Sequence, residues 1–163
     1  MLSEFSVDIN MDFIIPDFMD ASIPLQQCGE EIKNDAQRSI RLGIDFETDA
    51  PFAPLAKKTV KDKVRQVGFG NMPLFRKGIM YNAIHSYKVS NNTIVVGVIP
   101  RGNPPRDEVA GYHQVDGVNK YTRTVRRFLG VSAKRLQWIE ARMQRWVNER
   151  IQKASHEYIN LKI

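Results

Sequence analysis

Three histidines, one cysteine and two closely spaced glycines are the residues of this chain whose types and spacing could do chemistry. His85, His113 and His156 lie far apart, and no Asp, Glu or Cys accompanies them at the spacing of a metal site. No Ser-His-Asp order and no pair of buried carboxylates can be assembled for nucleophilic or acid–base catalysis. We therefore expect no metal, no cofactor and no enzymatic activity, and we interpret His113 as a hydrogen-bonded packing residue.

Gly68-Phe69-Gly70 is the segment that most resembles a phosphate-binding loop. Such a loop needs a strand before it and a helix after it, so that backbone N–H groups converge on the phosphate, and this context is missing. Cys28 belongs to an apolar helical stripe, where we expect it to behave as a small buried hydrophobe. Because it is the single cysteine, an internal disulfide is excluded.

Charge divides the chain into an acidic first third and a basic remainder. Residues 1–50 hold eleven acidic side chains against three basic ones, a net charge of −8, whereas residues 51–163 carry +14. A basic surface could bind nucleic acid. It could equally meet the acidic segment of its own chain or of a neighbouring copy, or form a solvated surface of mixed charge. The sequence leaves these alternatives open.

Two amphipathic helices are predicted, one near each end of the chain. In residues 24–42, apolar side chains recur at three- and four-residue steps, Pro24 fits the first turn and Gly43 ends the helix. In residues 132–156, Ser132 is the expected N-cap. The apolar stripe of this second helix comprises Leu136, Ile139, Met143, Trp146, Val147 and Ile151. A helix of this length cannot cover its own apolar face, so the rest of the chain must cover it.

The remaining regular pattern is that of β-strands. Alternating apolar and polar residues predict strands at 1–9 and 84–90, and an apolar run predicts another at 93–99. The last two form a hairpin across an Asn-rich turn. Residues 109–118 are a candidate additional strand. Because residues 94–99 are apolar on both faces, we expect one face to meet a helix and the other a neighbouring subunit.

The fold class expected is therefore α+β, in a single domain spanning 1–163. A small antiparallel β-sheet packs on one face against the two amphipathic helices, and long extended loops connect them. The basic segment 57–65 is either a short helix or a mobile loop, and 100–108 is a surface loop. No secretory leader is expected at the start, and no apolar run is long enough to span a membrane.

Four segments, in the same order along the chain, carry a family resemblance. They read Ala-Pro-Leu-Ala-Lys-Lys-Thr at 53–59, Met-Pro-Leu-Phe-Arg-Lys-Gly-Ile-Met at 72–80, Tyr-His-Gln-Val-Asp-Gly at 112–117 and Arg-Phe-Leu-Gly-Val-Ser at 127–132. These segments resemble the phage virion morphogenesis family, the tail completion proteins of Mu-like tailed phages. That family has Trp-x-Pro-Leu followed by Thr and Lys, Leu-x-x-Thr-Gly-x-Leu before a β-hairpin, His-Gln-Phe-Gly, and Arg-Pro-Phe-Leu-Gly-Leu-Ser before the final helix.

This sequence departs from the family pattern at four places. Phe52 stands where the family has Trp, and Lys77 where it has Thr. Asp116 is inserted before the glycine, and no proline separates Arg127 from Phe128. The departures leave the expected fold intact and leave open which ring of the phage neck the protein would form.

The resemblance implies a structural protein of a bacteriophage virion, assembled in the host cytoplasm and located at the head–tail neck. Its copies would form a ring, expected to be a hexamer, that completes the tail and leaves a lumen for the genome DNA. The implied partners are copies of itself, neck or head-closure proteins, and tail tube or tail terminator proteins. The residues expected at these contacts are Phe52, Lys57, Lys58, Lys61, Lys63, Arg65, Arg76, Lys77, Tyr112, His113, Gln114, Arg127, Phe128 and Trp138.

The alternative function is that of a basic nucleic-acid-binding protein. It predicts tight DNA binding that weakens steeply as salt rises, because each phosphate contact releases a counterion. The sequence has no recognised nucleic-acid-binding motif and few aromatic residues among its basic ones. Two further points stay open: Trp138 belongs either to the core or to a subunit contact, and the apolar end of the chain, 158–163, either frays or docks on another subunit.

Overall fold

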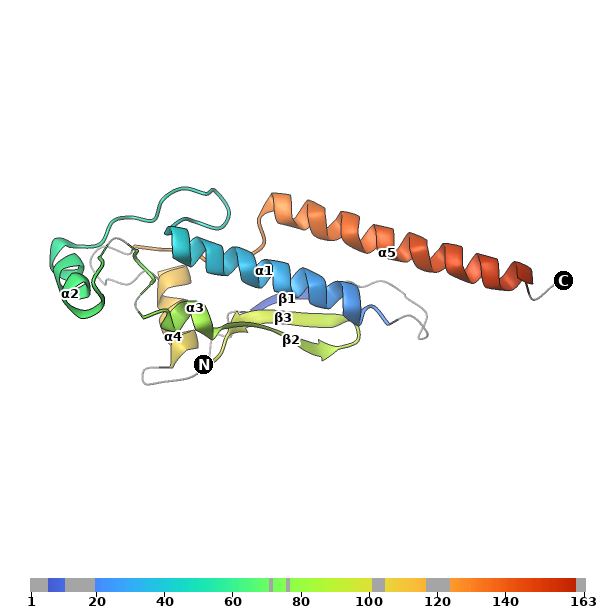
Figure 1. Cartoon of the computed structure of the whole chain (residues 1–163), viewed down its shortest axis with the longest axis horizontal. Helices are drawn as coiled ribbons and strands as arrows, with labels where there is room; N and C mark the ends of the chain where they lie inside the picture. The colour runs from blue at the N-terminus through green and yellow to red at the C-terminus, as the bar shows by residue number, and fades with distance from the viewer. Residues whose placement is uncertain are drawn as a thin grey trace.

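The computed structural model describes residues 6–10, 20–70, 72–75, 77–100, 105–116 and 124–160 of the chain. Figure 1 shows an elongated molecule in which α1 lies on the sheet and α5 lies on the outer side of α1. In chain order the elements are β1 (Ser6–Asn10), α1 (Ser22–Leu42), α2 (Lys57–Val67), α3 (Ile79–Ala83), β2 (Ile84–Ser90), β3 (Thr93–Val98), α4 (Arg106–Gly111), the π-helix η1 (Tyr112–Asp116) and α5 (Ala133–Asn160).

The described strands form one antiparallel sheet in the order β1-β3-β2. Val96, in the middle of β3, lies opposite Val7 of β1 and Ser86 of β2. β3 is therefore the central strand, and its side chains Ile94, Val96 and Val98 enter the core. The predicted α+β class and the 84–99 hairpin are confirmed, and the predicted N-terminal strand is confirmed at Ser6–Asn10.

Helix α1 follows the sequence pattern closely. Leu25, Cys28, Ile32, Ala36 and Ile40 are all buried, as their spacing predicts. Gly43 takes the left-handed conformation (φ 69°) that ends the helix, and its N–H donates to the carbonyl of Ser39 at 2.9 Å. This helix supplies the main cover of the sheet, because it packs on both β2 and β3.

α1 approaches the sheet most closely at Gly29. A methyl group on this residue would lie 2.4 Å from Ser86 Oγ and 2.5 Å from Ile94 Cγ2, well inside contact distance. The absence of a side chain therefore sets the distance between the helix and the two strands.

Gly29→Ala should lower the free energy of unfolding by about 1–2 kcal/mol. Overpacking costs about 1–3 kcal/mol, and contacts of 2.4 and 2.5 Å place this substitution in the upper part of that range, at about 2–3 kcal/mol. The better helix propensity of alanine offsets roughly 1 kcal/mol of it. Urea unfolding measures the difference. The matched control is Asn34→Ala, which changes an exposed residue of the same helix and should leave stability unchanged or slightly raised. Equal stability of wild type and Gly29→Ala would contradict the close approach.

Helix α5 begins as predicted but buries a narrower stripe. The Ser132 hydroxyl accepts a hydrogen bond from the N–H of Arg135 at 3.2 Å, which is an N-cap. Ile139, Met143 and Trp146 are buried, whereas Leu136 and Ile151 are about half exposed. For Ile151 the reason is visible in Figure 1, where the C-terminal part of α5 extends beyond α1 and the sheet. The sheet is covered directly by α1, and α5 packs on α1.

Residues 109–116 correct the expectation of an additional strand, because they form the end of α4 and η1 instead. Pro105 precedes this segment, and its carbonyl accepts the N–H of Val109 at 3.2 Å, as at the start of a helix. The edge of β3 away from β2 is occupied by β1.

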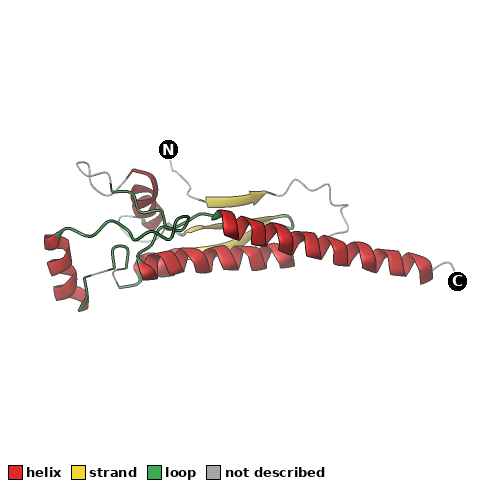
Figure 2. Cartoon of the chain, turned by 90° about the horizontal axis from the view of Figure 1, so that it is seen from above, coloured by secondary structure: helices red, strands yellow, loops and turns green. Residues whose placement is uncertain are grey.

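The basic segment after residue 56 is helical, which decides between the two alternatives left by the sequence. α2 ends at Gly68, whose φ of 81° again requires glycine, with the Gly68 N–H bonded to Val64 O at 2.9 Å. Figure 2 shows α2 at the end of the molecule opposite the C-terminus. The molecule therefore has two unlike ends, a basic helix at one and the projecting α5 at the other.

Candidate functional site

A cleft lies at the α2 end of the molecule, where α2, the 73–80 segment, α4 and residues 124–126 meet. Its volume is about 870 Å³. Apolar side chains form much of its wall, among them Leu55, Leu74, Ile79, Met80 and Val109. The charged side chains in the wall are all basic: Lys63, Lys77, Arg106 and Arg126. No acidic residue stands among the described residues that line it, so the cleft is complementary to an anion.

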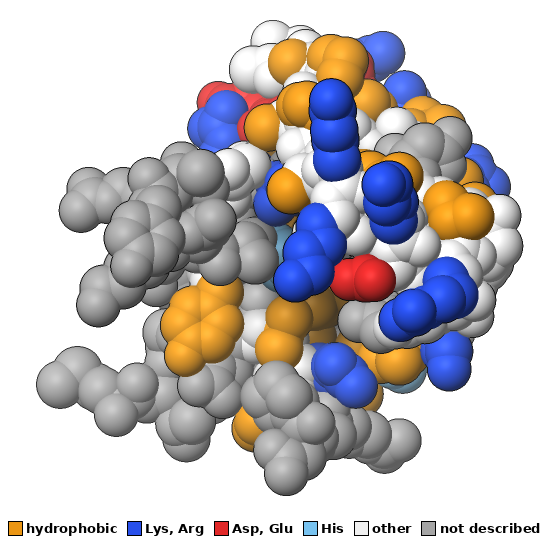
Figure 3. All heavy atoms as spheres, turned by 90° about the vertical axis from the view of Figure 1, so that its left-hand side faces the viewer, with side chains coloured by type: hydrophobic (Ala, Val, Ile, Leu, Met, Phe, Trp, Pro, Cys, Tyr) orange, Lys and Arg blue, Asp and Glu red, His pale blue; other side chains and the backbone are white. Residues whose placement is uncertain are grey.

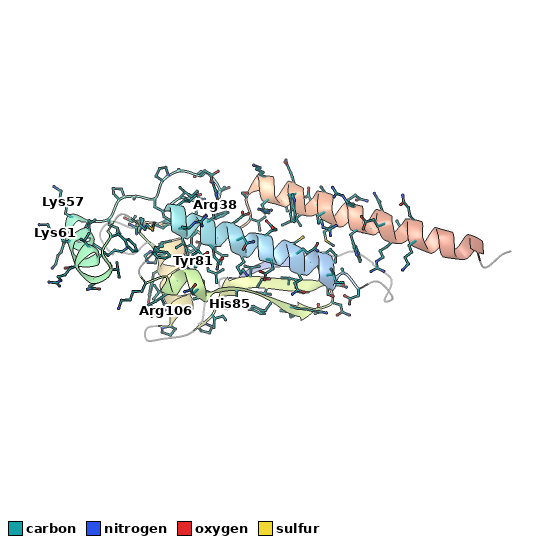
Figure 4. All side chains as sticks on the ribbon, viewed as in Figure 1. Arg38, Lys57, Lys61, Tyr81, His85 and Arg106 are labelled. Carbon is teal, nitrogen blue, oxygen red and sulfur yellow. The ribbon has the colours of Figure 1, made fainter. Side chains whose placement is uncertain are left out.

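The same end of the molecule is basic on its outer surface. Figure 3 looks onto this end and shows more Lys and Arg than Asp and Glu side chains on the described part of the face. In Figure 4, Lys57 and Lys61 project from the outer side of α2, away from α1, and Arg106 projects from α4 at the same end. The side chains of Lys57 and Lys61 are both exposed. The cleft and the outer face of α2 thus form one basic region.

Arg126 is the most unusual residue of the cleft. Its side chain is 5% exposed, and no described carboxylate lies within ion-pair distance of it. One Nη group donates to the carbonyl of Ala53 at 3.3 Å, while Nε is buried with no hydrogen-bond partner. Burial lowers the pKa of Arg126 from its ordinary value, because a charge removed from water is destabilised.

His113 lies in the same wall and is held neutral. Burial and then the positive charge of Arg126 lower the pKa of His113 to about 4, and its Nδ1 is buried with no partner. Its carbonyl accepts the N–H of Arg126 at 2.7 Å, which ties η1 to the 124–130 segment. His113 is therefore a packing residue, as the sequence indicated, but its Nδ1 lacks the hydrogen bond that we expected, and it lies in a π-helix and not in the candidate strand 109–118.

His113 should make stability fall as the pH is lowered from about 6.5 to about 4. In this window the unfolded chain binds a proton that the folded chain excludes, so acid favours unfolding by up to roughly 3 kcal/mol. His113→Gln should lose that part of the pH dependence, as measured by urea unfolding at half-unit pH steps. His85→Gln, which changes an exposed histidine, should keep the wild-type profile. Parallel profiles for wild type and His113→Gln would contradict the assignment.

Gln114, the next residue of η1, hydrogen-bonds to residues of the 127–132 segment, so it connects two of the four segments that carry the family resemblance. Its Oε1 accepts the N–H groups of Phe128 at 3.0 Å and Leu129 at 3.3 Å, and its Nε2 donates to the carbonyl of Leu129. Phe128 is fully buried and Leu129 is 5% exposed, so these backbone groups have no access to water. The Phe46 ring packs directly against Gly130 of the same segment, since a Cβ on Gly130 would lie 2.2 Å from Cζ of Phe46.

Part of the charge asymmetry is resolved within the chain. Arg127 bonds Asp45 at 2.8 Å and Glu47 at 2.7 Å, so the acidic connection after α1 is held against the segment before α5. Arg135 of α5 makes a bidentate pair with Asp35 of α1, at 2.6 and 2.9 Å. Acids of the first third therefore meet basic residues of the last third in the same molecule. The cations of the cleft take no part in these pairs.

The residues predicted for contacts fall into three groups. Lys57, Lys58, Lys61, Arg65, Lys77 and Tyr112 are exposed, and His113, Gln114 and Arg127 are half-buried. Phe52, Lys63 and Phe128 are buried in the chain, which corrects their placement on a contact surface. The phenylalanines enter the apolar core, and the Lys63 ammonium donates to the carbonyl of Met72. Arg76 lies outside the described residues.

Trp138 lies apart from this region, on the side of α5 that faces α1. It is 39% exposed, so it is not a core residue, and the Arg135 guanidinium stacks 5.0 Å from its ring centre. The structure brings together Lys63, Lys77 and His113 of the predicted set and adds Arg106 and Arg126, which sequence reasoning missed. The available signal for Arg126 was its place beside Arg127, but nothing in the pair shows which arginine points inward.

Within the part of the chain that the structure describes, no three His, Cys, Asp or Glu side chains converge as metal ligands would. None of the described helices combines the length and apolar character needed to cross a bilayer. Comparisons with protein-family models, with curated proteins and with solved structures found no match. We therefore infer the function from the residues themselves and from the geometry of the α2 end.

Proposed function

We propose that this chain is a structural subunit of the head–tail neck of a tailed bacteriophage. Its copies form a ring, hexameric by expectation, that completes the tail, joins it to neck and tail proteins and leaves a lumen for DNA. One observation carries the proposal: three of the four segments that resemble tail completion proteins line one basic cleft, and the fourth, 127–132, is hydrogen-bonded to the third through Gln114. Gln114 bonds Phe128 and Leu129, the Ala53 carbonyl accepts from Arg126, and Leu74 and Met80 line the same cleft.

The shape of the molecule supports assembly of this kind. Two unlike ends favour head-to-tail contacts, in which one patch meets a different patch and rotation closes a ring. In the described part of the chain, β2 pairs on one side only, and its Tyr87 and Val89 are 51% and 61% exposed. An unpaired edge beside exposed apolar side chains is a surface that another chain can cover.

The proposal is tested by imaging phage particles made with and without this protein. Without it, filled heads and finished tail tubes should accumulate separately, and adding the purified chain should restore joining. Fully joined virions in its absence would contradict the proposal.

The second candidate is a nucleic-acid-binding protein, favoured by the exposed face of α2. Lys57, Lys58, Lys61 and Arg65 all lie on this short helix. A gel-shift series with duplex DNA in rising salt tests it, because phosphate contacts predict a steep loss of affinity. Tight DNA binding by a chain that stays monomeric would favour this candidate over the ring.

A further inference from the structure

The cleft contains a buried positive charge that the described chain does not neutralise. The Arg126 side chain is 5% exposed, and no described carboxylate lies within ion-pair distance of it. An isolated buried charge is costly, and proteins normally pair it. Arg135 of α5, whose side chain is 19% exposed, is paired in this way with Glu31 and Asp35. Arg126 is an exception, and it lies in the wall of a cleft large enough for a ligand.

The wall of the cleft restricts the chemistry of that ligand. Lys77 and Arg106 add two further cations, so the ligand carries negative charge. Leu55, Leu74, Ile79 and Met80 supply apolar surface between them, which a free inorganic anion would leave uncovered. No Phe, Tyr or Trp stands among the described residues that line the cleft, and the His113 ring is half-buried in the wall, so nucleic-acid bases have little ring surface on which to stack. A phosphate of duplex DNA is part of a bulky sugar-phosphate backbone, which cannot enter far enough to reach the Arg126 guanidinium, because this side chain is 5% exposed.

We propose that this cleft binds an acidic peptide segment of a neighbouring protein, with one carboxylate paired to Arg126 and apolar side chains against Leu74 and Met80. A carboxylate on a flexible side chain is slender enough to reach Arg126, and it matches the planar guanidinium. The inference rests on the proposed function, since it names the partner chemistry of the same surface.

The probe for the test is a fluorescein-labelled peptide, Met-Asp-Phe-Ile-Ile-Pro-Asp-Phe-Met-Asp, the sequence of positions 11–20. It is chosen because it places three carboxylates between apolar side chains. Fluorescence anisotropy with the full chain should show saturable binding. The same peptide with its three Asp changed to Asn should bind at least about tenfold more weakly, since each lost charge pair at a desolvated site costs more than one at the surface.

The deciding variant is Arg126→Met, which removes the charge and keeps the length of the side chain. It should weaken peptide binding at least about tenfold. The melting temperature should stay equal or rise, because an unpaired buried charge is replaced by an apolar group. A purely structural Arg126 predicts the reverse, a lower melting temperature with unchanged affinity. Lys77→Gln, at an exposed position of the cleft, should weaken binding about three- to fivefold, and Lys134→Gln on α5 should not change it.

Several outcomes would overturn the inference. They are equal binding of the Asp and Asn peptides, equal loss from Lys77→Gln and Lys134→Gln, and a duplex DNA probe that loses affinity on Arg126→Met while the peptide does not. If Arg126→Met fails to fold, the Lys77 and Lys134 pair decides alone. A chain that forms rings but does not bind the peptide defeats only this inference. A strict monomer that binds the peptide defeats only the proposed function.

Discussion

Phe128→Ala is expected to lower the free energy of unfolding by about 4 kcal/mol. The Phe128 ring is fully buried in the core. Removing the ring loses its burial and leaves a cavity that a rigid surrounding cannot fill. Urea unfolding at neutral pH measures the change. Val125→Ala, three residues earlier and 42% exposed, is the control and should cost less than about 0.5 kcal/mol.

Phe128→Ala should also prevent formation of the proposed ring if residues 127–132 are needed to keep the elements of the α2 end in place. A Phe128→Ala chain with the stability of wild type would show that the segment is not packed as described. Phe128→Leu, which keeps most of the apolar volume, should lie between the two, at about 1.5 kcal/mol.

Gln114→Leu should cost at least about 3 kcal/mol, because it removes the partners of two buried N–H groups and one buried carbonyl. Each unsatisfied buried group costs roughly 1–3 kcal/mol, and leucine offers none of them a replacement. The control is Gln144→Leu on the exposed face of α5, where the amide bonds only Asn148, one turn along the helix. This control should change stability by less than about 0.5 kcal/mol. Similar losses for the two variants would contradict the bridging role of Gln114.

Sequence patterns predicted the structure correctly where it is determined by residues a few positions apart in the chain. The stripe of α1, the glycine that ends it and the Ser132 cap depend on residues within a few positions, and all were predicted from spacing. The α5 stripe was predicted too wide: Leu136 and Ile151 are about half exposed, and the exposure of Ile151 depends on where α1 and the sheet end. No property of α5 itself encodes that boundary.

Residues 109–116 show what local patterns cannot supply. Val109, Tyr112 and their neighbours suit a strand about as well as a helix over so short a stretch. The choice depends on Gln114, whose side chain binds backbone some fifteen residues later, and on β1, which occupies the free edge of β3. Both are long-range effects.

The candidate site shows the same division. The basic character of 57–77 could be predicted from composition, and the structure places Lys63 and Lys77 in the cleft wall. The inward turn of Arg126 and the outward turn of Arg127 follow from the path of the backbone between Phe46 and Gln114. A sequence shows two adjacent arginines and cannot assign one to a buried wall and the other to Asp45.

We propose that this chain works by contacts between protein surfaces, and its mass in solution is the sharpest test of that proposal. Sedimentation velocity of the purified full chain, alone and with tail tubes, over a range of concentrations and at two salt levels, gives the measurement. We expect a closed species of about six times the 18.7 kDa of one chain, formed alone or on the tubes. A single 18.7 kDa species under every condition, with none bound to tubes, would contradict it.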